Sequence, residues 1–220
     1  MVSASPRKPG RGRPPGAGRD SRGAVFQAAA LEFAERGFDA AGVDRIAARA
    51  RVNKAMLYYH FSSKVGLYHE VLNDMFRAVG QRVRSIADGP GDAGAKLDAW
   101  IRTIVEEAGE RAWFPPIMLR ELASGGTHLD PSTVGLMNAV VGAMRDIVIQ
   151  GQREGRFGRV DPLLVHLTIT PAILIFFARQ GVVVRRAKVG DARGVAAPIA
   201  VRPFIAHITS VARRMLQKDE

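Results

Sequence analysis

Apolar residues recur at helical spacing through almost every segment from Ala24 to the C-terminus. In the first segment Val25, Ala29 and Phe33 share one helical face, and Gly37 is a natural C-terminal stop. Apart from a short run at 182–184, no stretch alternates convincingly at a period of two. The pattern therefore predicts an all-α fold. We expect helices at about residues 24–36, 43–50, 53–61, 63–86, 93–109, 115–123, 131–154, 161–180 and 199–217.

Length and composition favour a globular protein of one large or two small domains. The chain has 220 residues, of which 47% are hydrophobic and 24% are charged. It has no cysteine, which excludes a disulfide scaffold, a thiol nucleophile and cysteine-ligated zinc or iron–sulfur sites. The N-terminus lacks the apolar core of a signal peptide. Both features fit a cytoplasmic protein.

Positive charge is concentrated at the N-terminus. The chain carries 32 Lys and Arg against 21 Asp and Glu, a net charge of +11. Residues 1–22 hold six basic groups and one acid, and they are rich in Pro and Gly, so we expect a disordered basic arm there. A basic arm on a nearly balanced body favours a nucleic-acid partner. A solubilising tail is the alternative.

The arm contains Arg11-Gly12-Arg13-Pro14, which is similar to the core of an AT-hook. A narrow A·T-rich minor groove has a deep negative potential that attracts inserted arginine side chains. We therefore expect Arg11 and Arg13 to contact DNA. A purely electrostatic tail without groove preference is the alternative.

Residues 43–61 hold two short helical patterns joined by a tight connection, which is typical of a helix-turn-helix. Six apolar residues, at positions 46, 47, 50, 52, 57 and 61, are spaced to form one small core. The other positions of the second helix suit DNA. Lys54 and Lys64 lie in first helical turns, where phosphate is favoured. Tyr58, Tyr59 and His60 offer hydrogen bonds and aromatic rings to a groove.

Here the chain strongly resembles the TetR/AcrR family of one-component transcriptional repressors, over about residues 20–75. Three blocks carry the resemblance: Ala28-Ala29 with Leu31 and Phe33-Ala34-Glu35-Arg36-Gly37-Phe38; Val43-Asp44-Arg45-Ile46-Ala47; and Leu57-Tyr58-Tyr59-His60-Phe61 followed by Ser63-Lys64. The resemblance implies a three-helix DNA-binding head and a long fourth helix within residues 23–86. It also implies an all-helical regulatory domain at 87–220 that binds a ligand and dimerises through its last two helices.

The family's recognition positions map onto the second short helix and the start of the next. With the arm and the first short helix included, the expected DNA-contacting residues are Arg11, Arg13, Arg45, Lys54, Ala55, Met56, Tyr58, Tyr59, His60 and Lys64. Three positions depart from the family pattern. Arg51 replaces a turn glycine, Gly42 replaces a capping threonine, and Val65 replaces an acidic residue. A left-handed non-glycine residue at 51 costs roughly 1 kcal/mol.

Within residues 87–220, aromatic, methionine and polar side chains on apolar helices are candidates to line a ligand cavity. They are Trp100, Trp113, Phe114, Met118, Met137, His166, Thr170 and Phe177. Core or dimer packing is the alternative for each. The most apolar stretch, 163–178, is too short and interrupted for a membrane span, so we expect a core helix or a subunit interface. Pro171 is expected to kink it.

Other motifs carry no chemistry. Gly89, Gly91 and Gly94 match a dinucleotide-binding pattern by letter but follow a predicted helix instead of a strand, so 88–92 is a linker. His69-Glu70 begins a zinc-protease pattern, but Asn73 stands in place of the second histidine. The five histidines show no metal spacing. We expect no catalytic residue, cofactor or metal.

The sequence therefore favours a homodimeric, ligand-responsive transcriptional repressor. It would bind a palindromic double-stranded DNA operator, respond to a small-molecule effector and have no membrane partner. Two alternatives remain. One is an architectural protein that binds A·T-rich DNA through the arm and has no operator. The other is an enzyme that is tethered to DNA by the head, which requires a titratable cluster in a pocket.

Overall fold

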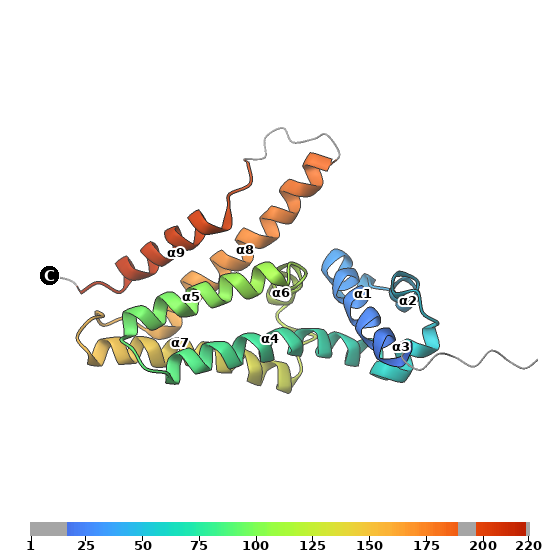
Figure 1. The fold of residues 1–220 in the computed structure, drawn as a ribbon, viewed down its shortest axis with the longest axis horizontal. Helices are drawn as coiled ribbons and strands as arrows, with labels where there is room; N and C mark the ends of the chain where they lie inside the picture. The colour runs from blue at the N-terminus through green and yellow to red at the C-terminus, as the bar shows by residue number, and fades with distance from the viewer. Residues whose placement is uncertain (1–16, 189–196, 219–220) are drawn as a thin grey trace, which may run out of the picture.

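The computed structural model describes residues 17–188 and 197–218, which form nine α-helices and no strand (Figure 1). This confirms the all-α prediction. The helices are α1 (Ala17–Ala40), α2 (Val43–Ala50), α3 (Lys54–Phe61), α4 (Lys64–Asp88), α5 (Ala93–Glu110), α6 (Phe114–Ala123), α7 (Pro131–Arg153), α8 (Pro162–Lys188) and α9 (Val201–Met215). We call α1–α3 the head and α4–α9 the body. The head lies at one end of the molecule, and α4 runs from it into the body.

The head packs around α1, which contacts α2, α3 and the first part of α4. Phe33, Ile46, Leu57 and Leu67 are fully buried where these helices meet. Because α2 and α3 have 8 residues each and contribute only a few apolar side chains, they are stable only when packed against α1 and α4.

Helix α1 differs from the expectation at both ends. It begins at Ala17, so the predicted disordered arm of residues 1–22 is too long by residues 17–22, which are helical. At the other end Gly37 has φ 77° and ψ 171°, which breaks the helical backbone where a stop was expected. The chain then continues in helical conformation to Ala40.

The body is built on α4, which packs along α7 and α5, with α8 closing the bundle against α5, α6 and α7. Trp100, Leu72, Ile101 and Ile147 are among its fully buried side chains. Asp92 caps α5, its side chain accepting a 3.0 Å hydrogen bond from Ala95 N. The glycine pattern of residues 89–94 therefore lies between two helices.

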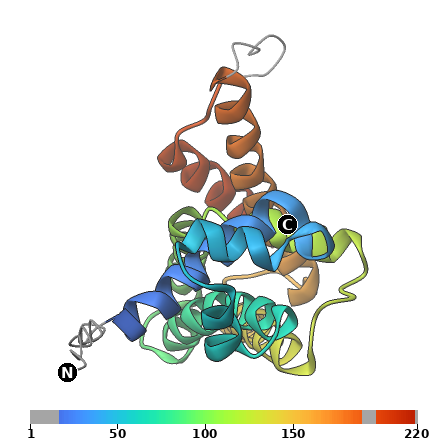
Figure 2. The same cartoon turned by 90° about the vertical axis from the view of Figure 1, so that its right-hand side faces the viewer.

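Helix α8 extends to Lys188, past the expected end at residue 180. The apolar run 182–184 is helical, so its period of two was not a strand signal. Pro171 lies inside the helix, which continues on both sides of it. Seen from the head end, α8 and α9 rise from the rest of the body (Figure 2).

Helices α7 and α8 are long and apolar enough to cross a bilayer by length and composition, with mean hydropathies of 1.3 and 1.8. Both also pack within the helical bundle, where α7 contacts α4 and α5, and α8 contacts α5, α6 and α7. Of the residues in the two apolar windows, 33% and 28% are buried in the described structure.

Candidate DNA interface, body cavity and the junction between them

Helices α2 and α3 form a compact bihelical unit. The turn between them is closed by Arg51, which has left-handed φ 56° and ψ 40°, and by a 3.0 Å hydrogen bond from Val52 N to Ala47 O. Asn53 then caps α3, its side chain accepting a 3.0 Å hydrogen bond from Ala55 N. Because Leu57 and Phe61 are buried against the head, the opposite side of α3 faces solvent.

Four of the six predicted positions on α3 lie on this outer side. Lys54, Ala55, Tyr58 and Tyr59 are exposed, with Tyr58 at 45% and Tyr59 at 78% exposure. Two adjacent exposed aromatic rings form a surface suited to a binding partner. Met56 is half-buried beside them. The outer side of α3 therefore offers two rings and one cation to a groove.

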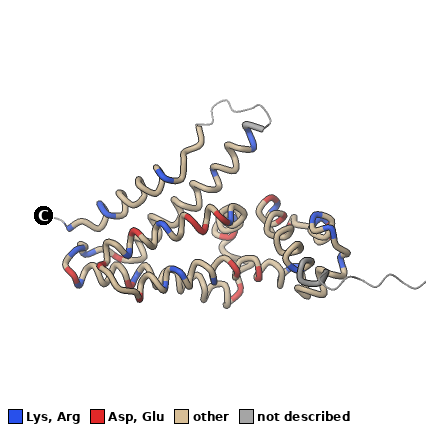
Figure 3. The backbone as a smooth tube through the Cα atoms, in the orientation of Figure 1, with Lys and Arg blue, Asp and Glu red and all other residues tan. Residues whose placement is uncertain are grey.

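Lysine and arginine positions also lie along α2 and its turn at the outer end of the head (Figure 3). Lys54 Nζ lies 2.9 Å from Asp44 Oδ1, and this partner raises the lysine pKa. Arg51 is exposed, and no ion pair to it is found within the described part of the chain. Arg51 is therefore a cation available to phosphate.

Three predicted contact residues are engaged inside the head. His60 Nε2 lies 2.8 Å from Ser21 Oγ at the start of α1. Lys64 Nζ donates to Asp39 O at 3.2 Å and lies over the Phe38 ring. These contacts tie α3 and α4 to both ends of α1.

Arg45, the third, links α2 to α1. Its Nε donates to Glu32 Oε1 at 2.5 Å, and its guanidinium also donates to Ala40 O. Burial raises the pKa of Glu32, but the hydrogen bond and charge of Arg45, with the charge of Arg36, outweigh burial and lower it overall. Arg45 therefore stabilises an otherwise costly buried carboxylate.

Arg11 and Arg13 lie outside the described residues. The described chain nevertheless starts close to α3, because Ser21 of α1 contacts His60 of α3. The described part of the chain therefore begins at the end of the head that carries α3.

A second feature is a partly open cavity of about 250 Å³ in the body, which we call the body cavity. It is bounded by α4–α8. Its lining residues are Met75, Phe76, Val79, Ile104, Ala108, Phe114, Met118, Leu122, Met137, Val140, Val141, Leu163, His166, Leu167, Thr170, Pro171 and Leu174. It brings together five of the eight predicted ligand residues, namely Phe114, Met118, Met137, His166 and Thr170.

The other three predicted residues lie elsewhere. Trp100 is fully buried in the core, and its ring stands edge-on to His166 with the centroids 5.9 Å apart. Trp113 packs edge-on against Phe26 of the head. Phe177 lines a separate hollow between α6 and the second half of α8. The sequence analysis did not name several lining residues, among them Leu163, Leu167 and the α4 residues. Apolar residues at helical spacing indicate one face of a helix but not whether that face lines a cavity.

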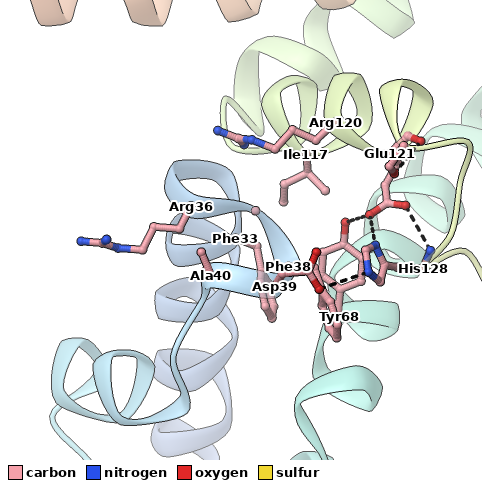
Figure 4. A pocket seen from close by; sticks show the side chains of 12 residues that line it. Phe33, Arg36, Phe38, Asp39, Ala40, Tyr68, Ile117, Arg120, Glu121 and His128 are labelled. Carbon is pink, nitrogen blue, oxygen red and sulfur yellow. Dashed lines mark hydrogen bonds and ion pairs between the residues drawn. The ribbon is translucent and has the colours of Figure 1, made fainter.

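The third feature joins head and body. A hollow of about 220 Å³, the junction hollow, lies between the end of α1, α4 and α6 (Figure 4). The buried carboxylate of Glu121 accepts from Tyr68 Oη at 2.5 Å and lies 3.1 Å from His128 Nδ1. Burial, with the hydrogen bond to Glu121, raises the pKa of Tyr68, so its hydroxyl stays protonated.

Helix α6 also holds the broken end of α1 directly. Arg120 Nη1 donates to Ala34 O at 2.6 Å, and Nη2 donates to Glu35 O at 3.3 Å. A helix end leaves such carbonyls without partners in the helix, so the arginine satisfies them and matches the negative helix end. Added to Gly37, a Cβ atom would lie 3.3 Å from Arg120 Cδ.

Residues 25–71 match the family described as bacterial regulatory proteins, tetR family. The chain is 38% identical over 93 residues to the transcriptional activator FasR of Mycolicibacterium smegmatis. This match covers 40% of this chain and 42% of FasR. The chain therefore spans less than half of that relative. It is 27% identical to the transcriptional repressor NicS of Pseudomonas putida, over 71% of this chain and 74% of NicS.

Solved structures share the whole fold. A tetR-family regulatory protein from Rhodococcus RHA1 has a TM-score of 0.71 at 20% identity, covering 91% of this chain and 98% of its own. The ketosteroid regulator KstR2 of Mycobacterium tuberculosis has a TM-score of 0.68 at 23% identity, covering 90% and 95%. The head matches by sequence and the body matches by architecture. The chain therefore carries an N-terminal segment similar to the tetR family of bacterial regulatory proteins, on a fold that it shares with these solved structures.

Proposed function

We propose that this protein is a homodimeric transcriptional repressor of the cytoplasm that binds a palindromic operator and is released by a small molecule in the body cavity. The observation that carries the proposal is the position of α6 between the two sites. Phe114 and Met118 of α6 line the body cavity, while Arg120 and Glu121 of the same helix face the head. A ligand that shifts α6 in the cavity would therefore also shift the contacts of α6 with the head.

On this proposal the outer side of α3 enters the major groove. Tyr58 and Tyr59 supply rings for sugar or thymine methyl groups, and Lys54 supplies a charge for phosphate. Arg51 adds a second phosphate contact beside them. His60, Lys64 and Arg45 hold the head together, and they contact DNA only through the atoms that these bonds leave free.

The dimer forms through α8 and α9. Leu164, Ile175 and Val182 of α8 are half exposed or more. They are 11 and 7 residues apart, close to three and two whole turns, so they share one face. Ile199 and Val201 continue the exposed apolar surface at the start of α9. A second copy of the same face would cover these side chains in a twofold interface.

Release follows from differential affinity. A ligand weakens operator binding only if it prefers a body conformation whose two heads no longer fit half-sites about 34–36 Å apart. Helix α6 transmits that preference because Arg120 holds α1 by its C-terminal carbonyls. FasR is named an activator and NicS a repressor, and the longer match to NicS favours repression.

The test is selection of bound duplexes from a random DNA pool by the full-length protein at about 150 mM salt. We expect a palindromic consensus with half-sites about one helical turn apart. A Val182→Asp variant, which places a charge on the proposed dimer face, should lose the palindrome but keep half-site preference. Enrichment of A·T-rich DNA without a palindrome would contradict the proposal and favour an architectural protein.

A further inference from the structure

The wall of the body cavity is uncharged. All the residues that line it are apolar except His166 and Thr170, and none is Asp, Glu, Lys or Arg. An ion that enters such a cavity loses its water without gaining a counter-charge, which costs several kcal/mol. The cavity therefore selects against carboxylate and ammonium ligands alike.

The two polar residues form a pair on one side of the cavity. His166 Nδ1 lies 3.3 Å from Thr170 Oγ1, one helical turn away on α8. Within residues 17–188 and 197–218, Thr170 is the one hydrogen-bond partner of the His166 ring. The other ring nitrogen, Nε2, has no hydrogen-bond partner within those residues.

The His166 ring is neutral near pH 7, because burial lowers its pKa below the usual 6.5. A neutral imidazole has one donor and one acceptor nitrogen, and the threonine hydroxyl serves as either. The pair thus offers a hydrogen bond to an uncharged oxygen group and no charge to balance an ion.

We propose that the effector is an uncharged, mainly apolar molecule with one hydroxyl or carbonyl group, which hydrogen-bonds to His166 and Thr170. The inference rests on the proposed function, because it takes the body cavity as the effector site. The volume of about 250 Å³ is just below the roughly 300–1,000 Å³ of typical ligand sites, so the molecule is compact.

The test uses three ligands that share one chain and differ at its end: octanol, octanoate and octylammonium. Their binding to the full-length protein is measured by titration calorimetry at pH 7. We expect octanol to bind at least about tenfold more tightly than either ion, because only the ions must be desolvated without a counter-charge. Tighter binding of octanoate or octylammonium, or no binding of any of the three, would overturn the inference.

The polar pair is tested with near-isosteric variants. Thr170→Val and His166→Phe should each weaken octanol binding by about tenfold, through loss of one hydrogen bond. Thr168→Val is the matched control, because Thr168 is exposed on α8 and does not line the cavity. All three variants should keep operator affinity, which shows that they fold. Equal octanol affinity in all three would overturn the role of the pair.

A separate readout distinguishes this inference from the proposed function. Operator binding is followed by fluorescence anisotropy at saturating octanol. If octanol binds as expected but leaves the operator complex intact, the ligand chemistry stands and octanol-driven release fails. If an ion binds best and releases the operator, the repressor function stands and the ligand chemistry is overturned.

Discussion

The guanidinium of Arg120 donates to the main-chain oxygen of Ala34 at 2.6 Å, joining residues 86 positions apart across the boundary between body and head. Helix α6 reaches this contact from the wall of the body cavity. Arg120 is therefore a direct link between the helix that lines the body cavity and the head.

Arg120→Ala should therefore uncouple the sites. We expect the variant to bind the effector normally, while the effector's influence on operator affinity falls by about tenfold, within the usual 1–3 kcal/mol of allosteric coupling. Operator titrations with and without effector measure this. Arg102→Ala, which removes an exposed arginine of α5, is the control. Equal coupling in both variants would exclude Arg120 as the link.

The two exposed tyrosines of α3 should each matter for DNA and not for stability. Tyr58→Ala and Tyr59→Ala are expected to weaken operator binding by roughly tenfold or more, since good groove contacts contribute about 1–3 kcal/mol. Their thermal unfolding should match the wild type because neither ring is buried. His207→Ala, an exposed change on α9, is the reference. Wild-type operator affinity in both tyrosine variants would remove α3 from the interface.

Arg51→Gly should change stability and DNA binding in opposite directions. Relief of the left-handed backbone at φ 56° should raise the free energy of unfolding by about 1 kcal/mol. Loss of one phosphate contact should reduce the salt slope of DNA binding by about one unit. Denaturant titration and binding at several salt concentrations test the two effects. An unchanged slope would show that Arg51 does not contact phosphate.

Deletion of residues 1–16, which leaves α1 whole, should make DNA binding less salt-dependent. Fewer released counterions are expected because four of the six basic residues of segment 1–22 are removed. Replacement of Arg11 and Arg13 by lysine keeps the charge and separates groove recognition from simple attraction. If the deletion variant shows the same salt dependence of DNA binding as the full-length protein, the arm does not contact DNA.

The Glu32 carboxylate makes the free energy of unfolding depend on pH in the acid range. Its pKa is lowered in the folded protein, because Arg45 and Arg36 outweigh burial, so its contribution is complete above the usual 4.5. That contribution is lost as pH falls through the folded value. Glu32→Gln should cost about 1.5 kcal/mol at pH 7, the low end for a charged hydrogen bond because Arg45 is half exposed. The difference from wild type should shrink below pH 4.5, as measured by urea unfolding. A constant difference would contradict the pairing.

Local signals explain which elements were predictable. The expected starts of α3 and α4 at residues 53 and 63 were accurate to one residue, because Asn53 and Ser63 cap these helices and a cap depends only on the next two or three residues. The start of α1 was missed because residues 17–22 carry no apolar periodicity. The end of α8 lies beyond the expected residue 180 because the glycine at 181 is typical of a helix end, whereas helix packing tolerates a glycine there.

The candidate sites divide in the same way. The outer side of α3 was predictable, because its motif fixes both the helix and the face. The junction hollow was not, since Tyr68 and Glu121 are 53 residues apart and no spacing rule relates them. Trp113 and Phe177 were expected in the cavity, but their type indicates burial without saying against which neighbour.

The exposed apolar face of α8 also has a consequence for the protein concentration that operator binding requires. If operator binding requires the dimer that this face forms, a dilute solution contains mostly protomers, and the concentration of dimers rises with the square of the protomer concentration. Operator occupancy then has a threshold in expression level, even though each operator binds a single dimer. A modest fall in synthesis would relieve repression steeply, without any ligand.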